Sequence, residues 1–131
     1  MSKLEKLLES IDCDKATPVS DMDIQRHEKD LHLKFGPIYT HFLSKYGCVV
    51  AGSKEIYGVC GDNASIPSAI HATKSARRQS HFPQHLLVIA EDGSGRKFCI
   101  DSDDTVHMWD RNTCSKSGKS FDEFAVEWLG V

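Results

Sequence analysis

The stretch from Pro83 to Asp110 constrains the fold more than any other part of the sequence. Residues 86–90 form an unbroken apolar run between a proline and a glycine-containing turn, which is typical of a strand buried on both faces in the middle of a sheet. Residues 97–101 alternate between apolar and polar side chains, as in a strand with one face toward a core. A second turn at 102–104 precedes a third strand at 105–109. The stretch therefore predicts a three-stranded antiparallel meander.

Further elements are predicted on both sides of the meander. Residues 48–51 and 55–59 predict a pair of strands, and the polar residues 111–119 predict a loop. The segment 66–78 has a weak pattern that fits either a short helix or a mobile segment. Stronger helical patterns combine apolar stripes with capping residues such as Ser20, Pro37 and Ser120, and they cover residues 2–11, 20–33, 37–46 and 120–129.

The length of 131 residues fits one domain, and 40% apolar composition is ordinary for a protein that buries a core. We expect a single α+β domain over residues 1–131, in which a mainly antiparallel sheet of about five or six strands packs against helices. Five cysteines without a Cys-x-x-Cys pair favour reduced thiols and a cytoplasmic location. The sequence has no apolar leader and no window near the ~18 apolar residues of a membrane span, so we expect no membrane association.

The charge of the chain is concentrated on the meander. The net charge is −3, and residues 91–110 contain six acids but only two bases. Such a charge distribution repels nucleic acid and attracts a basic protein partner. A solvated hairpin rim without any partner would have the same composition.

The histidines do not have the spacing of a metal site. Pro83 separates His81 from His85, so these two side chains do not form a helical ligand pair. His27 and His32 are five residues apart and face different directions on a helix. We therefore expect neither a metal nor another cofactor.

Two patterns raise the possibility of catalysis. Gly118-Lys119-Ser120 resembles the end of a phosphate-binding loop, but Thr113 occupies the position of the first glycine, and Ser120 is better explained as a helix cap. A cysteine hydrolase would need Cys60 or Cys99 together with a histidine such as His107 and an acid such as Asp110, and Cys99 could lie across from His107 in the meander. No motif surrounds either thiol, so we keep this enzyme as an alternative behind a binding function.

The chain carries an ordered series of short motifs. The series consists of Tyr39-x-x-Phe42-Leu43-x-x-Tyr46-Gly47, Glu55-Ile56-Tyr57-Gly58, residues 86–95, Phe98-Cys99-Ile100-Asp101, Val106-x-x-Trp109-Asp110 and Ser120-Phe121-x-x-Phe124. Over roughly residues 20–129 this series resembles the SUKH superfamily, and in particular the branch with the fungal cell-wall assembly regulator and many bacterial immunity proteins. The helix entry Phe35-Gly36-Pro37 departs from the usual Leu-Pro start of that family.

The resemblance implies a compact α+β domain without catalytic activity. In bacteria such domains commonly neutralise toxins, often nucleases, that the same cell delivers to competitors. The eukaryotic relatives suggest an alternative, an intracellular regulatory or scaffold domain that recruits other proteins.

The acidic meander and the resemblance together predict a binding surface. We expect Trp109 to fill the core or the wall of a cleft. The residues predicted to contact a partner along one rim are Tyr57, Glu91, Asp92, Asp101, Asp103, Asp104 and Asp110. The hypothesis is a monomeric or weakly dimeric immunity protein that binds and neutralises a basic cognate toxin, without a catalytic residue and without binding nucleic acid or a membrane.

Overall fold

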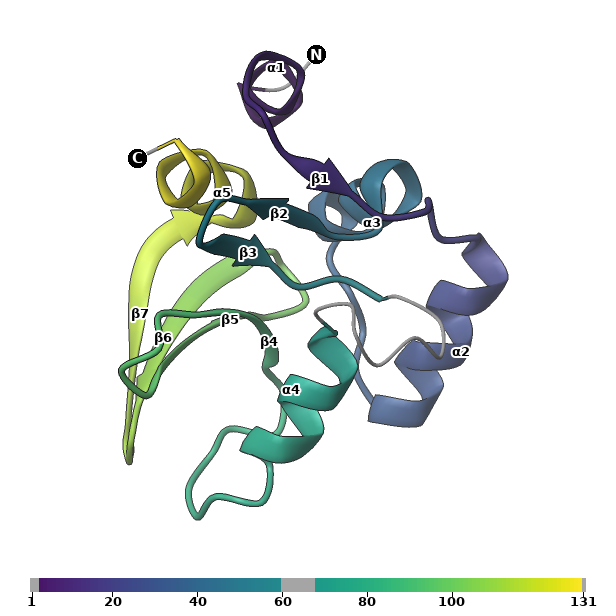
Figure 1. Ribbon diagram of the computed structural model, residues 1–131. Helices are drawn as coiled ribbons and strands as arrows, with labels where there is room; N and C mark the ends of the chain where they lie inside the picture. Colours follow the sequence, from purple (N-terminus) through teal and green to yellow (C-terminus); the bar gives the residue numbers. More distant parts are fainter. Residues whose placement is uncertain (1–2, 60–67, 131) are drawn as a thin grey trace.

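Two antiparallel sheets form the centre of the computed structural model, which describes residues 3–59 and 68–130 (Figure 1). The strands are β1 (Asp14–Lys15), β2 (Val49–Ala51), β3 (Lys54–Ile56), β4 (Leu87–Glu91), β5 (Arg96–Ile100), β6 (Thr105–Asp110) and β7 (Thr113–Ser120). The order is β1-β2-β3 in the smaller sheet and β4-β5-β6-β7 in the larger sheet. The expected α+β class is confirmed, with the strands divided between two sheets.

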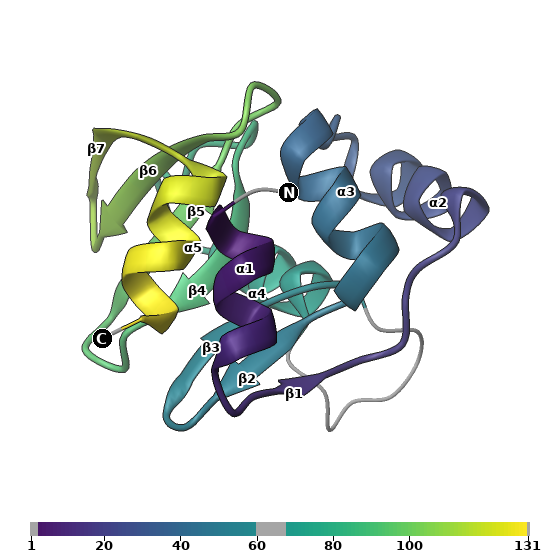
Figure 2. The same ribbon diagram turned by 90° about the horizontal axis from the view of Figure 1, so that it is seen from above.

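Within the described residues five helices cover the sheets; four correspond to helices predicted from the sequence, and the fifth lies in the segment where the pattern fitted either a helix or a mobile segment. They are α1 (Lys3–Ser10), α2 (Asp21–Leu31), α3 (Pro37–Tyr46), α4 (Ala69–Ala76) and α5 (Phe121–Leu129). Figure 2 shows α1 beside α5, with α3 and then α2 on the other side of α1. The weak pattern at 66–78 forms a helix from Ala69, and its first two residues, like Ser2 at the start of the first pattern, lie outside the described residues.

The helix ends have the caps that the sequence predicts. The Ser20 side chain accepts a hydrogen bond from the backbone N–H of Asp23 (3.2 Å). Ser120 and Glu123 form a reciprocal capping box, which confirms that Ser120 begins a helix. Gly47 follows α3 with a φ of 74°, a value that glycine adopts without steric cost.

The predicted meander is present as β4, β5 and β6, and β4 is buried on both faces as expected. Leu87 and Ile89 belong to the main core, whereas Leu86 and Val88 belong to a second apolar cluster on the other face of the sheet. Trp109 is fully buried in this second cluster, so its predicted place in the core is confirmed.

The predicted central position of β4 is wrong, because β4 is the first strand in the order of the larger sheet. The backbone N–H of Tyr57 donates to the carbonyl of Ile89 (2.7 Å) and joins the end of β3 to β4. An apolar run buried on both faces can therefore be an edge strand, provided that other elements cover it; here α4 packs against β4.

The polar segment 111–119 was predicted as a loop, but most of it forms strand β7. This strand pairs with β6 from Asp110–Thr113 through His107–Lys116, with a register shift near its end. Residues 113–118 are exposed, so neither face of that part of the strand packs into the core, and the sequence lacks the alternation by which strands are recognised. The two-residue strand β1 was also missed for lack of a pattern.

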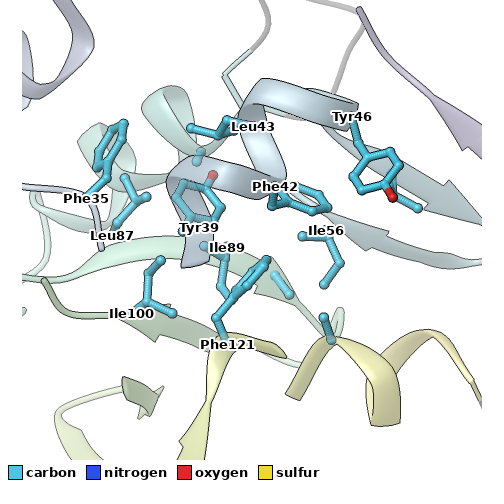
Figure 3. Close-up of a cluster of buried hydrophobic side chains, with 14 of the residues drawn as sticks. Phe35, Tyr39, Phe42, Leu43, Tyr46, Ile56, Leu87, Ile89, Ile100 and Phe121 are labelled. Carbon is cyan, nitrogen blue, oxygen red and sulfur yellow. The ribbon is translucent and has the colours of Figure 1, made fainter. Parts of the chain in front are cut away.

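Helix α3 packs over the meander through aromatic side chains (Figure 3). The ring of Phe121 lies edge-on to Tyr39, with centroids 5.1 Å apart, and also contacts Phe42 at 5.3 Å. The hydroxyl of Tyr39 donates to the backbone carbonyl of Tyr57 (2.8 Å). The main core thus joins α3, α5 and the smaller sheet.

Asp104 holds the β5–β6 turn against α3. Its carboxylate accepts hydrogen bonds from the backbone N–H groups of Ile38 (2.8 Å) and Tyr39 (2.9 Å), which are the first free donors of α3. Its own carbonyl accepts from the backbone N–H of Phe121 (2.8 Å). Burial raises the pKa of Asp104 although both amides favour the charged form. Gly36 leaves room for the carboxyl group, since a Cβ there would overlap it.

The prediction that Asp104 contacts a partner is therefore wrong. Its side chain is only 1% exposed and serves the fold. The turn residue Asp103 beside it is exposed. Sequence reasoning could not separate these neighbours, because both are aspartates in the same turn.

We expect Asp104→Asn to destabilise the protein by roughly 1–3 kcal/mol, because an amide replaces one acceptor oxygen with a donor that faces backbone N–H groups. Asparagine tolerates the positive φ of 61° at this position, so the loss of stability measures the contribution of the hydrogen bonds and not backbone strain. Urea unfolding measures the effect. The control, Asp103→Asn, should change the free energy of unfolding by less than about 0.5 kcal/mol. Equal effects of the two substitutions would contradict the capping role.

Candidate functional site

The six acidic residues predicted to contact a partner are divided between the two ends of the meander. Successive turns of an antiparallel meander lie at opposite ends, so the turns 92–95 and 111–112 share one end and the turn 101–104 lies at the other. The five residues of β5 separate the ends by about 15 Å. The single acidic rim predicted from the sequence is therefore wrong. The first end holds Glu91, Asp92 and Asp110, and the second end holds Asp101, Asp103 and Asp104.

At the second end, Asp101 organises its own turn. Its carboxylate accepts from the backbone N–H groups of Asp103 (2.9 Å) and Thr105 (3.0 Å) and contacts Nε2 of His107 at 2.9 Å. Burial raises the pKa of Asp101, but these hydrogen bonds outweigh it and hold the pKa below its usual value. Because Asp101 and Asp104 are both committed to the fold, Asp103 is the exposed carboxylate of this turn.

At the first end, three of the predicted residues line one open depression of about 490 Å³ between β3, the β4–β5 turn and α5. We call it the acidic depression, and its lining residues are Ser53, Lys54, Glu55, Tyr57, Glu91, Asp92, Gly93 and Trp128. The lining therefore combines three carboxylates with one ammonium group and two aromatic rings.

Tyr57 and Glu91 form the fixed part of the acidic depression. The Tyr57 hydroxyl donates to Oε1 of Glu91 (3.2 Å), and the Lys97 ammonium donates to Oε2 (2.8 Å). Burial raises the pKa of Tyr57, and the negative charge of Glu91 raises it further. The hydroxyl is therefore protonated at neutral pH and acts as a hydrogen-bond donor.

Trp128 forms the aromatic wall of the acidic depression. The Lys54 ammonium lies 3.9 Å from the centroid of the Trp128 ring, within the range of a cation–π interaction. The indole N–H donates to the carbonyl of Glu55 (3.1 Å), and the ring packs against Phe98 at 5.1 Å. The last turn of α5 is thus attached to β3, beside the carboxylates.

Sequence reasoning missed Trp128, Lys54 and Glu55 as residues of this site. Trp128 lies in the segment 120–129 that the sequence predicts as a helix with an apolar stripe, and its indole is only partly buried. The available signal was its residue type, because tryptophan is enriched at the centres of protein interfaces. Nothing in the sequence shows that β3 and α5 end at the same place.

Asp92 is the exposed carboxylate at the rim of the acidic depression. One of its oxygens accepts from the backbone N–H (2.9 Å) and the hydroxyl (2.7 Å) of Ser94, and these bonds hold the pKa of Asp92 below its usual value. The carboxylate is therefore ionised at neutral pH. Carboxylates beside aromatic rings can receive a lysine or arginine side chain through charge-assisted hydrogen bonds and cation–π contact.

Asp110 belongs to a different depression of about 570 Å³ on the other side of the β4–β5 turn. Its carboxylate lies 3.7 Å from Nε of Arg96, and Arg111 also lines this depression. Two guanidinium groups therefore accompany one carboxylate. The structure does not bring Asp110 together with the other predicted acids.

Of the residues considered for a cysteine hydrolase, Cys99, His107 and Asp110 do not form a catalytic site. Cys99 does pair with His107 across β5 and β6, as the sequence allowed. However, burial raises the pKa of the Cys99 thiol, whereas catalysis requires a thiolate. Asp110 is three residues from His107 along β6, so its side chain points to the opposite face of the sheet. Cys60 lies outside the described residues.

The metal-ligating side chains and the helices of the described chain bear on two further possibilities, a metal site and a membrane span. No group of three metal-ligating side chains gathers within residues 3–59 and 68–130. In the same residues, no helix has the length and apolar character needed to cross a membrane. Lys119, from the segment that resembles a phosphate-binding loop, pairs with Glu127 on α5.

Comparisons with known proteins agree with the fold and cover almost the whole chain. The family described as SUKH_5, SMI1-KNR4 cell-wall, matches residues 2–129. A crystal structure of a protein from Pseudomonas syringae pv. tomato superposes with a TM-score of 0.71 and 21% sequence identity, over 98% of this chain and 97% of that chain. At this identity the superposition shows a shared fold. A search of curated proteins finds no match.

Alkylation of the native protein with iodoacetamide at pH 7 should leave Cys99 unmodified, because its thiol is 0% exposed and protonated. The exposed Cys114 should react slowly, and faster as the pH rises, because desolvation raises its pKa as well. Mass spectrometry of the digested protein resolves the two sites. Both thiols should react in urea, which serves as the control. Rapid modification of Cys99 in the folded protein would restore the hydrolase alternative.

Proposed function

Because this chain belongs to the SUKH_5 family, the SMI1-KNR4 cell-wall group of the SUKH superfamily, we propose that it is a non-catalytic domain that acts by binding another protein. The acidic depression supports this proposal. It combines a fixed hydrogen-bonded pair, Tyr57 and Glu91, with an aromatic wall at Trp128 and an exposed carboxylate at Asp92. Such a surface recognises charge and shape and has no activated nucleophile.

We propose further that the partner is a cognate toxin and that this protein is the immunity protein that neutralises it. The family includes immunity proteins, which is the first support. The second is electrostatic, because nucleases grip phosphates and so present lysine and arginine side chains. A basic side chain of the toxin would enter the acidic depression and meet Glu55, Glu91 and Asp92.

The charge of the acidic depression favours rapid capture of a basic partner. Complementary charge raises the association rate above the ~10⁵–10⁶ M⁻¹s⁻¹ of an unsteered encounter. Rapid association is useful to an immunity protein, because a free toxin damages its own cell. Because Lys97 already neutralises Glu91, the exposed Asp92 and the neighbouring Glu55 carry the steering.

A second candidate is a regulatory or scaffold domain that recruits a cellular protein, and the family description, which names the cell wall, favours it. Both candidates use a protein-binding surface. They differ in the partner, because an immunity protein is specific for one toxin that its own cell makes, whereas a regulator has partners unrelated to toxins.

Expression of the adjacent open reading frame should arrest growth if it encodes the toxin, and co-expression of this protein should restore growth. The two proteins should then purify together. If cells that express the adjacent open reading frame without this protein grow normally, and the two proteins do not purify together, the regulatory candidate is favoured.

Asp92→Lys should slow association with the partner obtained by co-purification by about tenfold at low salt and flatten the salt dependence of the rate. Stopped-flow mixing at several ionic strengths measures both effects. Asp103→Lys is the matched control, since it makes the same change in net charge at the opposite end of the meander, and it should have a much smaller effect. Equal effects of the two substitutions would show that only the overall charge matters and would remove the acidic depression as the site.

A further inference from the structure

Strand β7 is the open edge of the larger sheet. It is the last strand in the order β4-β5-β6-β7, and Figures 1 and 2 both show it at the outside of the molecule. Within the described residues, no backbone hydrogen bond joins residues 113–119 to any element beyond β6. The opposite edge differs, because Tyr57 bonds to Ile89 there and α4 covers β4.

The open edge presents unpaired backbone groups in a regular register. Four consecutive pairs, from Asp110–Thr113 to His107–Lys116, follow the two-residue turn. Counted from that turn, the alternation of an antiparallel ladder directs the backbone N–H groups of Cys114 and Lys116 away from β6. Residues 113–118 are exposed, so another chain can reach these groups.

The charge of this edge is opposite to that of the rest of the molecule. Residues 111–120 contain Arg111, Lys116 and Lys119 and no acid, although the whole chain has a net charge of −3. Lys119 is paired with Glu127. Within the described chain, no carboxylate lies within 4.0 Å of the Lys116 ammonium or the Arg111 guanidinium.

We propose that β7 binds an extended acidic segment of a partner protein as a fifth strand of the sheet. Backbone hydrogen bonds to the outward N–H and C=O groups hold such a strand, and side-chain charge selects it. Glutamate or aspartate side chains of the added strand lie beside Lys116 and Arg111. This surface is separate from the acidic depression, so the inference goes beyond the function proposed above.

A second copy of the chain fits this edge less well. Pairing β7 with another β7 would bring together two sets of cations without any acid, and like charges on neighbouring strands repel each other. The polar composition of residues 113–118 also provides no apolar surface for a dimer to bury.

The probe is a blocked eight-residue peptide in which threonine and glutamate alternate, and the comparison peptide has lysine in place of glutamate. We expect the glutamate peptide to bind, to shift the amide resonances of Cys114 and Lys116 and to slow their hydrogen exchange. Cys114→Pro removes one outward N–H without removing a bond to β6, and it should weaken binding by about tenfold. The matched control, Cys114→Ser, keeps the N–H and should bind within about twofold of the native protein.

Lys116→Glu tests the charge separately and remains informative if the proline variant fails to fold. It should weaken binding of the glutamate peptide and strengthen binding of the lysine peptide. Equal binding of the two peptides by the native protein, or unchanged binding by both Cys114→Pro and Lys116→Glu, would overturn the proposal. A dimer that protects the amides of Cys114 and Lys116 and that the glutamate peptide does not dissociate would also overturn it, because β7 would then be occupied by a second copy.

Discussion

The hydrogen bonds from the start of α3 to the carboxylate of Asp104 fix how the helical layer sits on the meander. They satisfy two helix donors inside the protein and bring Tyr39 over the core. Tyr39 in turn donates to the carbonyl of Tyr57, whose own N–H joins β4. One continuous set of contacts therefore leads from the β5–β6 turn to the acidic depression at the opposite end of the sheet. Gly36, where the helix entry differs from the usual Leu-Pro start of the family, belongs to the same arrangement, because the absence of a side chain there makes room for the carboxyl group of Asp104.

Local patterns predicted most of the fold, and the elements that were missed depend on contacts with other segments of the chain. Ser20, Pro37 and Ser120 begin helices because their chemistry satisfies or tolerates free backbone donors, which is a property of neighbouring residues alone. The strand β7 was missed because its stability comes from pairing with β6, and its exposed side chains have no periodicity. The edge position of β4 was missed because burial by helices and burial by strands produce the same apolar run.

The candidate site was less predictable than the fold, because it depends on contacts between distant segments. Tyr57, Glu91 and Asp92 were predicted individually from the sequence. Trp128 and Glu55 lie beside them only because the end of α5 contacts β3. Grouping Asp103 with Asp92 was an avoidable error, since the meander itself requires alternate turns to lie at opposite ends. The roles of Asp104 and Asp101 could not be predicted, because a buried aspartate and an exposed aspartate look alike in a sequence.

Tyr57 makes three hydrogen bonds to two elements: its N–H donates to Ile89 and its hydroxyl to Glu91, both in β4, and its carbonyl accepts from Tyr39 of α3. The floor of the acidic depression is consequently preorganised. A ligand that settles there loses little conformational entropy on the protein side, and the free and bound backbones should nearly superpose. Because such a binding site does not adapt its shape, it selects ligands whose shape is already complementary to it.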